Sequence, residues 1–101
     1  MKLIFGGFDW DYGNRNKCQK HGVTLLEIEL LFAGTPLIGP DLSHSTTETR
    51  YRAIGRIEKE KMIFAVFTLR IIGGVNLIRP ISARFMHAKE IEYYDKIQAT
   101  T

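Results

Sequence analysis

Three arginines stand in or beside apolar, strand-like runs of the chain. They are Arg70, Arg79 and Arg84, within or at the end of the segment KMIFAVFTLRIIGGVNLIRPISAR (61–84). A guanidinium in such a position is costly unless it is paired or binds an anion. Several arginines beside a carboxylate such as Glu48 can bind a phosphodiester and stabilise the charge of its transition state.

Ribonuclease chemistry suits this set of residues. RNA carries its own nucleophile, the 2′-hydroxyl, so this chemistry requires neither a serine or cysteine nucleophile nor a metal ion. Glu48 or His21 would transfer protons. The alternative is a structural ion-pair network between Glu48 and the neighbouring arginines, and the residue types alone leave both interpretations open.

Local turn signals predict which of these residues meet. Gly73-Gly74 favours the positive φ angles of a tight hairpin turn. Pairing about that turn sets Arg70 opposite Leu77 and Thr68 opposite Arg79. Residues that are directly opposed share one face of the sheet, so this face is expected to be polar at one end.

A second turn, at residues 58–60, extends the same face. It sets Arg50 opposite Thr68 and Glu48 opposite Arg70. The other face would be the core, with Tyr51, Ala53, Ile57, Ile63, Ala65, Phe67, Leu69 and Ile78. The predicted register therefore gathers Glu48, Arg50, Thr68, Arg70 and Arg79 at one end of the sheet.

Arg84 is expected to stand apart from this cluster. The same register pairs it near Ile63, seven residues from Arg70, which is roughly 23 Å along a strand. Its expected place is the junction between the last strand and the final helix.

Two helices are predicted before the sheet. NRNKCQKHG (14–22) has Asn14 as a possible N-cap and Gly22 as a stop, and Lys17, Lys20 and His21 would share one face. Thr24 and Glu27 form a T-x-x-E capping box, which begins a second helix that ends near Gly34.

The remaining segments complete an α+β domain that spans residues 1–101. Residues 3–10 favour a short N-terminal strand, and residues 35–47 a loop with one short edge strand. Runs at 50–57, 62–70 and after Gly74 predict a three-stranded antiparallel β-meander. A C-terminal helix is expected from Phe85 onward, with Met86, Ile91, Tyr94 and Ile97 near one face.

Bulk properties limit the possible functions. The chain has 101 residues, a formal net charge of +3 and a single cysteine, Cys18, so no intramolecular disulfide can form. No stretch is typical of a signal peptide or a membrane span, so a cytoplasmic protein is expected. The C-x-x-H spacing of Cys18 and His21 lacks a second ligand pair, and we expect no metal and no cofactor. His44 and His87 are left outside the site.

Four segments together resemble the BrnT family of toxins. They are FDWDYGNRNKCQKHGV (8–23), DLSHSTTETRYRAIG (41–55), FTLR (67–70) and IRPISARFMHAKEIEYY (78–94). K-H-G, H-S-x-x-E-x-R, T-x-R and I-S-A-R occur in the family's order. Pro80 departs from the apolar residue with a free N–H that many members have, and it predicts an edge strand or a bulge.

The resemblance implies a fold similar to the RelE-like ribonuclease toxins and a metal-independent endoribonuclease that arrests growth. It also implies a cognate antitoxin, typically a ribbon-helix-helix DNA-binding protein, in a hetero-oligomer that binds operator DNA through the antitoxin. Carried onto this chain, the motif positions are Lys20, His21, Glu48, Arg50, Arg70, Arg79 and Arg84.

Two functions remain open from the sequence. In the first, Arg50, Arg70 and Arg79 hold the phosphate of an RNA substrate, His21 or Glu48 transfers protons, and Lys17, Lys20 and Arg84 bind RNA. In the second, the chain is a non-catalytic module whose basic face binds nucleic acid or an acidic protein, as the partner of a DNA-binding repressor.

Overall fold

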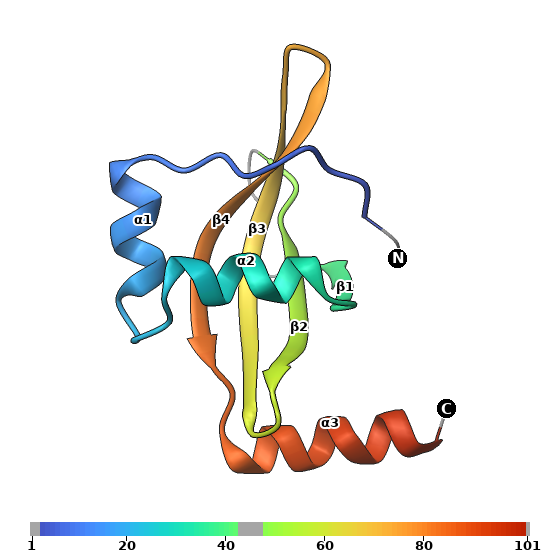
Figure 1. Ribbon diagram of the computed structural model, residues 1–101. Coiled ribbons are helices and arrows are strands. Elements are labelled where there is room, and N and C mark those ends of the chain that lie inside the picture. Colours follow the sequence, from blue (N-terminus) through green and yellow to red (C-terminus); the bar gives the residue numbers. More distant parts are fainter. Residues whose placement is uncertain (1–2, 43–47, 101) are drawn as a thin grey trace.

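The computed structural model describes residues 3–42 and 48–100, which form seven regular elements (Figure 1). In chain order they are α1 (Tyr12–Gln19), α2 (Leu25–Ala33), β1 (Leu37–Pro40), β2 (Tyr51–Glu58), β3 (Lys61–Ile72), β4 (Val75–Phe85) and α3 (Ala88–Thr100). The α+β class is therefore confirmed. His44 lies outside the described residues.

The sheet has four antiparallel strands in the order β1-β2-β3-β4, one more than the predicted meander. The additional strand is β1, the short edge strand expected within residues 35–47, and it pairs Ile38 with Ala53 of β2. Each strand pairs with its neighbour in the chain, so every connection within the sheet is local.

The register of the central hairpin is the predicted one. Gly73 and Gly74 have φ angles of 59° and 79°, as a two-residue turn of this kind requires. Arg70 pairs with Leu77 and Thr68 with Arg79. Both arginines therefore lie on the same face of the sheet.

A β-bulge in β4 shifts the pairing beyond this point. Phe67 pairs with Pro80 but Val66 pairs with Ser82, so Ile81 is the extra residue. As a result Arg84 pairs with Phe64 rather than with the expected Ile63. The irregularity predicted from Pro80 is present, and it moves Arg84 onto the same face as Arg70 and Arg79.

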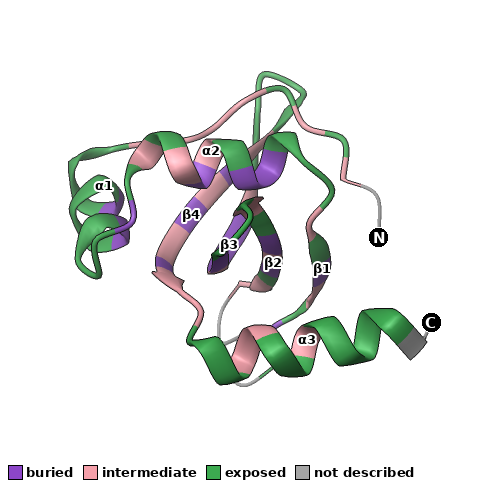
Figure 2. Ribbon diagram, turned by 60° about the horizontal axis from the view of Figure 1, so that its bottom comes forward, coloured by how far each residue is buried: buried purple, intermediate pink, exposed green. Residues whose placement is uncertain are grey.

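The hydrophobic core lies between the sheet and α2. Figure 2 shows α2 with its buried residues toward the sheet and α3 on the opposite side. The predicted inward face is confirmed, since Ala53, Ile63, Ala65, Phe67 and Ile78 are fully buried. They pack in one cluster with Cys18, Val23, Ile28, Leu31 and Phe32 from the helical segment. The face of the sheet opposite α2 is called the outer face below.

Side-chain caps begin both helices of this segment. The capping box of α2 is confirmed, because Glu27 N–H donates to Thr24 Oγ1 and Thr24 N–H to Glu27 Oε1. α1 begins earlier than predicted, because Asp11 is its N-cap and Asn14 closes the box at the third helical position. α1 also ends at Gln19, so His21 lies beyond the helix.

The two ends of the chain differ from the prediction. Residues 3–10 do not form the expected strand and make only one isolated bridge, between Phe8 and Ile78. They run along the free edge of β4, where Gly6 N–H donates to Asn76 O. β4 continues to Phe85, and α3 therefore begins at Ala88. None of the helices in the described ranges has the length and apolar run that a membrane-spanning helix needs.

Gly55 allows α2 to approach β2 closely, which gives a first prediction. A Cβ at Gly55 would lie 2.7 Å from Leu31 Cδ1, whereas a Cβ at Gly39 in β1 would meet no atom within 4 Å. We expect Gly55→Ala to lower the free energy of unfolding by about 1–3 kcal/mol through overpacking. Gly39→Ala is the matched control and should change it little. Urea unfolding of both variants tests this, and equal stabilities would contradict it.

Candidate phosphate-binding site

A pocket of about 410 Å³ opens where α1, β3, β4 and the segment before β2 meet. Four cationic side chains and one carboxylate line it: Lys17, Arg50, Arg70, Arg79 and Glu48. The rest of the wall is Gly13, Asn14, Pro80 and Ile81. The structure thus brings together four of the residues predicted for the site, with Lys17 beside them.

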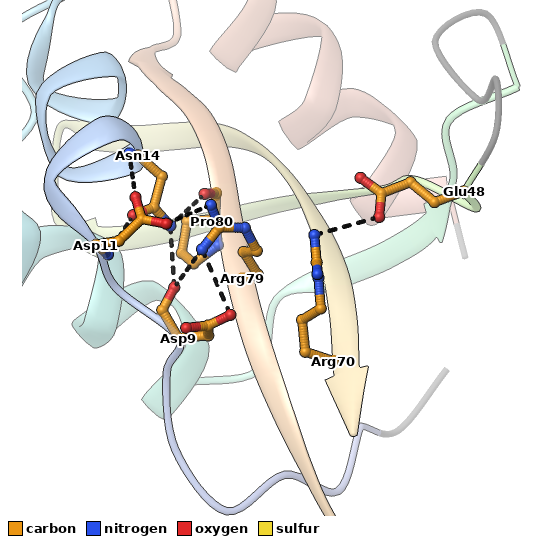
Figure 3. A network of polar contacts seen from close by, with 7 residues as sticks. All are labelled: Asp9, Asp11, Asn14, Glu48, Arg70, Arg79 and Pro80. Carbon is orange, nitrogen blue, oxygen red and sulfur yellow. Dashed lines mark hydrogen bonds and ion pairs between the residues drawn. The ribbon is translucent and has the colours of Figure 1, made fainter. Parts of the chain in front are cut away.

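Arg70 and Glu48 face each other across this pocket (Figure 3). Arg70 Nη2 lies 3.7 Å from Glu48 Oε2, a distance too long for a hydrogen bond. About half of the Arg70 side chain is exposed. Such an exposed, open ion pair contributes little stability, so a phosphate can compete for the guanidinium at small cost.

Arg79 is held far more firmly than Arg70. Its Nη2 donates to Asp11 Oδ2 at 2.6 Å, and its Nη1 lies 3.4 Å from Asp9 Oδ2. The hydrogen bond to Asp11 raises the pKa of Arg79. In return, the Asn14 N–H and then Arg79 lower the pKa of Asp11. Arg79 therefore contributes a fixed cation, and its charge is partly balanced by Asp9 and Asp11, which do not line the pocket.

Sequence reasoning missed Asp9 and Asp11 as partners of Arg79. The contacts join residues about 70 positions apart. No local pattern links them, although the D-W-D triplet ahead of a basic helix was a signal that carboxylates lie near the cations.

Asn14 fastens α1 to the bulged part of β4. Its side chain is buried, and Nδ2 donates to Pro80 O at 2.9 Å and to Asp9 O at 3.0 Å. Its Oδ1 accepts the N–H of Asp11 at 2.7 Å. A single side-chain amide thus ties the start of α1, the preceding segment and β4 together (Figure 3).

The chain before β2 is also fixed by hydrogen bonds. Thr68 Oγ1 donates to Thr49 O at 2.9 Å, and Asp41 N–H donates to Arg50 O at 2.8 Å. The first bond continues the alignment of β2 with β3 beyond the Tyr51–Phe67 pair, and the second continues that of β1 with β2 beyond the Pro40–Tyr51 pair. They place Arg50 and Glu48 at the pocket, as the register predicted.

His21 and Lys20 are not placed with this cluster. Because α1 ends at Gln19, Lys20 and His21 follow it as exposed residues. His21 lines a separate hollow of about 100 Å³ with Phe64, Ser82, Ala83 and Arg84. The prediction that Lys17, Lys20 and His21 share one helix face is therefore wrong, and His21, the predicted alternative to Glu48 for proton transfer, does not line the pocket.

Arg84 stands apart from the pocket, as expected, and is paired with Glu90 of α3. Its Nη1 and Nη2 donate to the two carboxylate oxygens at 2.8 and 3.0 Å, a bidentate pair. Arg84, followed by the His87 N–H, lowers the pKa of Glu90 to about 2. The Arg84 guanidinium also lies over the Phe64 ring, 5.0 Å from its centroid.

A larger hollow, of about 680 Å³, lies between α3 and the outer face. Its lining is mostly apolar and includes Leu37, Ile54, Met86 and Tyr93. Three cations also line this hollow, Arg52, Arg84 and Lys89, but Arg84 is paired with Glu90. The candidate site for an anion is the smaller pocket, where four cations lie with one carboxylate. Within residues 3–42 and 48–100, no group of three or more His, Cys, Asp and Glu side chains is arranged to hold a metal ion.

The fold and the pocket together define a class of protein: a small basic α+β domain that presents an arginine-rich site with a carboxylate. The family model described as the BrnT ribonuclease toxin of type II toxin–antitoxin systems matches residues 10–90. The chain therefore belongs to the BrnT family, which implies an antitoxin partner. A comparison with curated proteins finds no match.

Asp11 is both the N-cap of α1 and an ion-pair partner of Arg79, so its substitutions should differ in their effect on the melting temperature. Asn caps a helix as well as Asp does, whereas Ala does not. Asp11→Asn removes the charge beside Arg79 but keeps the cap, so it should melt close to the wild type. Asp11→Ala loses both and should melt at a lower temperature. Thermal unfolding followed by circular dichroism measures the difference, and identical melting of the two variants would show that the cap contributes nothing.

The Arg84–Glu90 pair predicts a pH-dependent contribution to stability. The pKa of Glu90 falls from its ordinary 4.5 to about 2 in the folded protein, so the pair stabilises the fold above pH 4.5. This contribution is lost as the pH falls through 2. Because both side chains are more than a third exposed, Glu90→Gln should cost at most about 1 kcal/mol at pH 7.

Urea unfolding at pH 7, 4.5 and 2.5 tests this pH dependence. The gap between wild type and Glu90→Gln should shrink as the pH falls. Glu92→Gln is the matched control, since Glu92 pairs with Lys96 on the same helix with both side chains largely exposed. A gap that stays constant with pH would refute the assignment.

Proposed function

We propose that the protein is a metal-independent endoribonuclease in which the arginine pocket binds the scissile phosphodiester of RNA. The observation that carries this proposal is the convergence of Lys17, Arg50, Arg70 and Arg79 with Glu48 in one open pocket. Membership of a ribonuclease toxin family supports the same substrate class. Four cations against one carboxylate give the lining of the pocket a net positive charge, which attracts a phosphate.

The arginines differ in what they offer a phosphate. Arg70 has a loose partner, so its N–H donors are available to the phosphate oxygens. Arg79 is fixed by Asp9 and Asp11, and it supplies a positioned charge rather than a mobile clamp. Arg50 and Lys17 line the pocket beside them. Together they would stabilise the negative charge that develops on the pentavalent phosphorus.

Glu48 is the candidate general base. It is the carboxylate that lines the pocket, and His21 lies in another hollow. Glu48 would accept the proton of the 2′-hydroxyl as that oxygen attacks the adjacent phosphorus. The P–O5′ bond then breaks, and the leaving 5′ oxygen takes up a proton from water. The expected products are a 2′,3′-cyclic phosphate and a 5′-hydroxyl end.

Cleavage of naked RNA by the purified protein tests these roles. Glu48→Gln should lower kcat by about 10²–10⁴-fold, because it removes the proton acceptor. Arg70→Ala should lower it by about 10²–10³-fold, because it removes a donor to the transition state. Lys96→Ala is the control, since it removes one positive charge from the exposed face of α3 and should leave kcat unchanged. EDTA should leave the rate unchanged.

The non-catalytic alternative makes the opposite prediction. A protein that binds RNA but never cuts it, with or without added antitoxin or ribosomes, would contradict the proposal. RNA with a 2′-deoxy nucleotide at the cleaved position should resist cleavage, which identifies the nucleophile.

We also propose the wider behaviour of the toxin class for this chain. The protein would act in the cytoplasm, and its expression should arrest the growth of the cell. Glu48→Gln should relieve the arrest. The antitoxin is proposed to be a ribbon-helix-helix protein that forms a hetero-oligomer with the toxin and carries it to operator DNA. Co-purification with the product of a neighbouring gene, followed by a mobility-shift assay on operator DNA, tests this arrangement.

A further inference from the structure

The outer face carries a second feature, formed by Arg84 and Phe64, beyond the arginine pocket. The guanidinium of Arg84 lies over the Phe64 ring with its centre 5.0 Å from the ring centroid. Phe64 and Arg84 are directly paired residues of β3 and β4, and the bulge at Ile81 is what brings Arg84 to this face. The stack is therefore built into the register of the sheet.

Glu90 decides what this arginine can still bind. The carboxylate takes both terminal nitrogens along one edge of the guanidinium, at 2.8 and 3.0 Å, and balances its charge. Arg84 is consequently a poor ligand for a phosphate, unlike Arg70. The pair fixes the guanidinium plane, and 38% of the Arg84 side chain remains accessible. A fixed guanidinium plane is a platform on which a nucleic-acid base can stack.

Polar groups stand beside this platform. The hollow of about 100 Å³ between the stack and the end of α1 is lined by Phe64, Arg84, Ser82 and His21. The Ser82 hydroxyl and the His21 imidazole each supply donor and acceptor atoms, which the edge of a base requires. The hollow thus offers a stacking surface and hydrogen-bonding groups together.

The hollow also lies within reach of an RNA strand bound at the pocket. Arg79 pairs with Thr68 and Arg84 with Phe64, so four residues of β3 separate the two places on one face. At the rise of a strand this is about 13 Å. A single RNA strand whose phosphate occupies the pocket can therefore reach the stack with a neighbouring nucleotide.

We propose that the hollow formed by His21, Phe64, Ser82 and Arg84 is a base-binding subsite for a nucleotide that flanks the cleaved bond in single-stranded RNA. The subsite rests on the proposed ribonuclease function for its place beside the reaction. It gives His21 and Arg84 a role in substrate recognition instead of proton transfer or phosphate binding.

Binding of non-cleavable RNA tests the subsite without depending on catalysis. A set of fluorescent 2′-O-methyl oligonucleotides, each with a single abasic position, is titrated against the wild-type protein by fluorescence anisotropy. One abasic position should weaken binding about tenfold, because a stacked base is lost. Arg84→Lys keeps the positive charge but lacks the planar guanidinium. It should therefore bind the parent oligonucleotide about tenfold more weakly, and its affinity should no longer depend on the base at that position.

Arg56→Lys is the matched control. Arg56 is also an exposed arginine that pairs with a carboxylate of α3, Asp95, at 2.8 Å, but it does not line the hollow. Arg56→Lys should lose as much affinity as the wild type does when the base at that position is absent. If Arg84→Lys unfolds, His21→Ala, which changes an exposed residue at the same hollow, should show a smaller loss of the same positional sensitivity.

The outcomes separate this proposal from the ribonuclease function. Absence of RNA cleavage alongside a position-specific abasic effect would overturn only the ribonuclease function. Two outcomes would overturn only the subsite, in each case with normal RNA cleavage. In the first, no abasic position weakens binding. In the second, Arg84→Lys responds to the abasic positions as the wild type does. Failure of every oligonucleotide to bind would overturn both.

Discussion

The hydrogen bond from Asn14 Nδ2 to Pro80 O joins the first helix to the one irregular point of the β3–β4 pair. Pro80 has no N–H of its own, so the ladder is already weakened there, and the extra residue Ile81 follows at once. Arg84 depends on this point for the face on which it lies, whereas Arg79 precedes the bulge in the regular part of β4. A regular strand would turn Arg84 toward the core, where Ala83 now lies fully packed.

The arginines of the outer face differ in how fully their charges are balanced. Arg84 has a bidentate carboxylate, Arg79 has one close carboxylate and one more distant, and Arg70 has a carboxylate beyond hydrogen-bonding distance. The capacity to take up a new anion therefore rises from Arg84 to Arg70. Chemically identical side chains thus differ in the positive charge that they can offer to an anion, because their acidic neighbours lie at different distances.

Local signals accounted for much of the architecture. Gly73-Gly74 set the hairpin register, and the Thr24–Glu27 box set the start of α2, because both act within a few residues. The meeting of Glu48 with Arg70 followed from the pairing of β2 with β3 about the turn at residues 58–60. Pro80 indicated an irregularity but could not show that Ile81 would be the extra residue, since the bulge also involves Asn14, which donates to Pro80 O from 66 positions away.

Contacts between distant segments were not predictable in the same way. Asp9 and Asp11 reach Arg79 only after α1 has docked on β4. The position of His21 depended on whether the first helix ended at Gln19 or two residues later, a difference that its sequence does not encode clearly.

The attachment of α3 has a consequence for how ionic strength acts on the molecule. Arg56–Asp95 and Arg84–Glu90 are among the contacts that join α3 to the strands, and the four side chains are between about a third and a half exposed. Added salt screens such pairs and also weakens the attraction between the arginine pocket and a phosphate. Salt should therefore loosen α3 and release an anionic ligand over the same concentration range. The slope of the logarithm of the binding constant for an anionic ligand against the logarithm of salt concentration would then reflect both events. The number of phosphate contacts calculated from that slope would be too high.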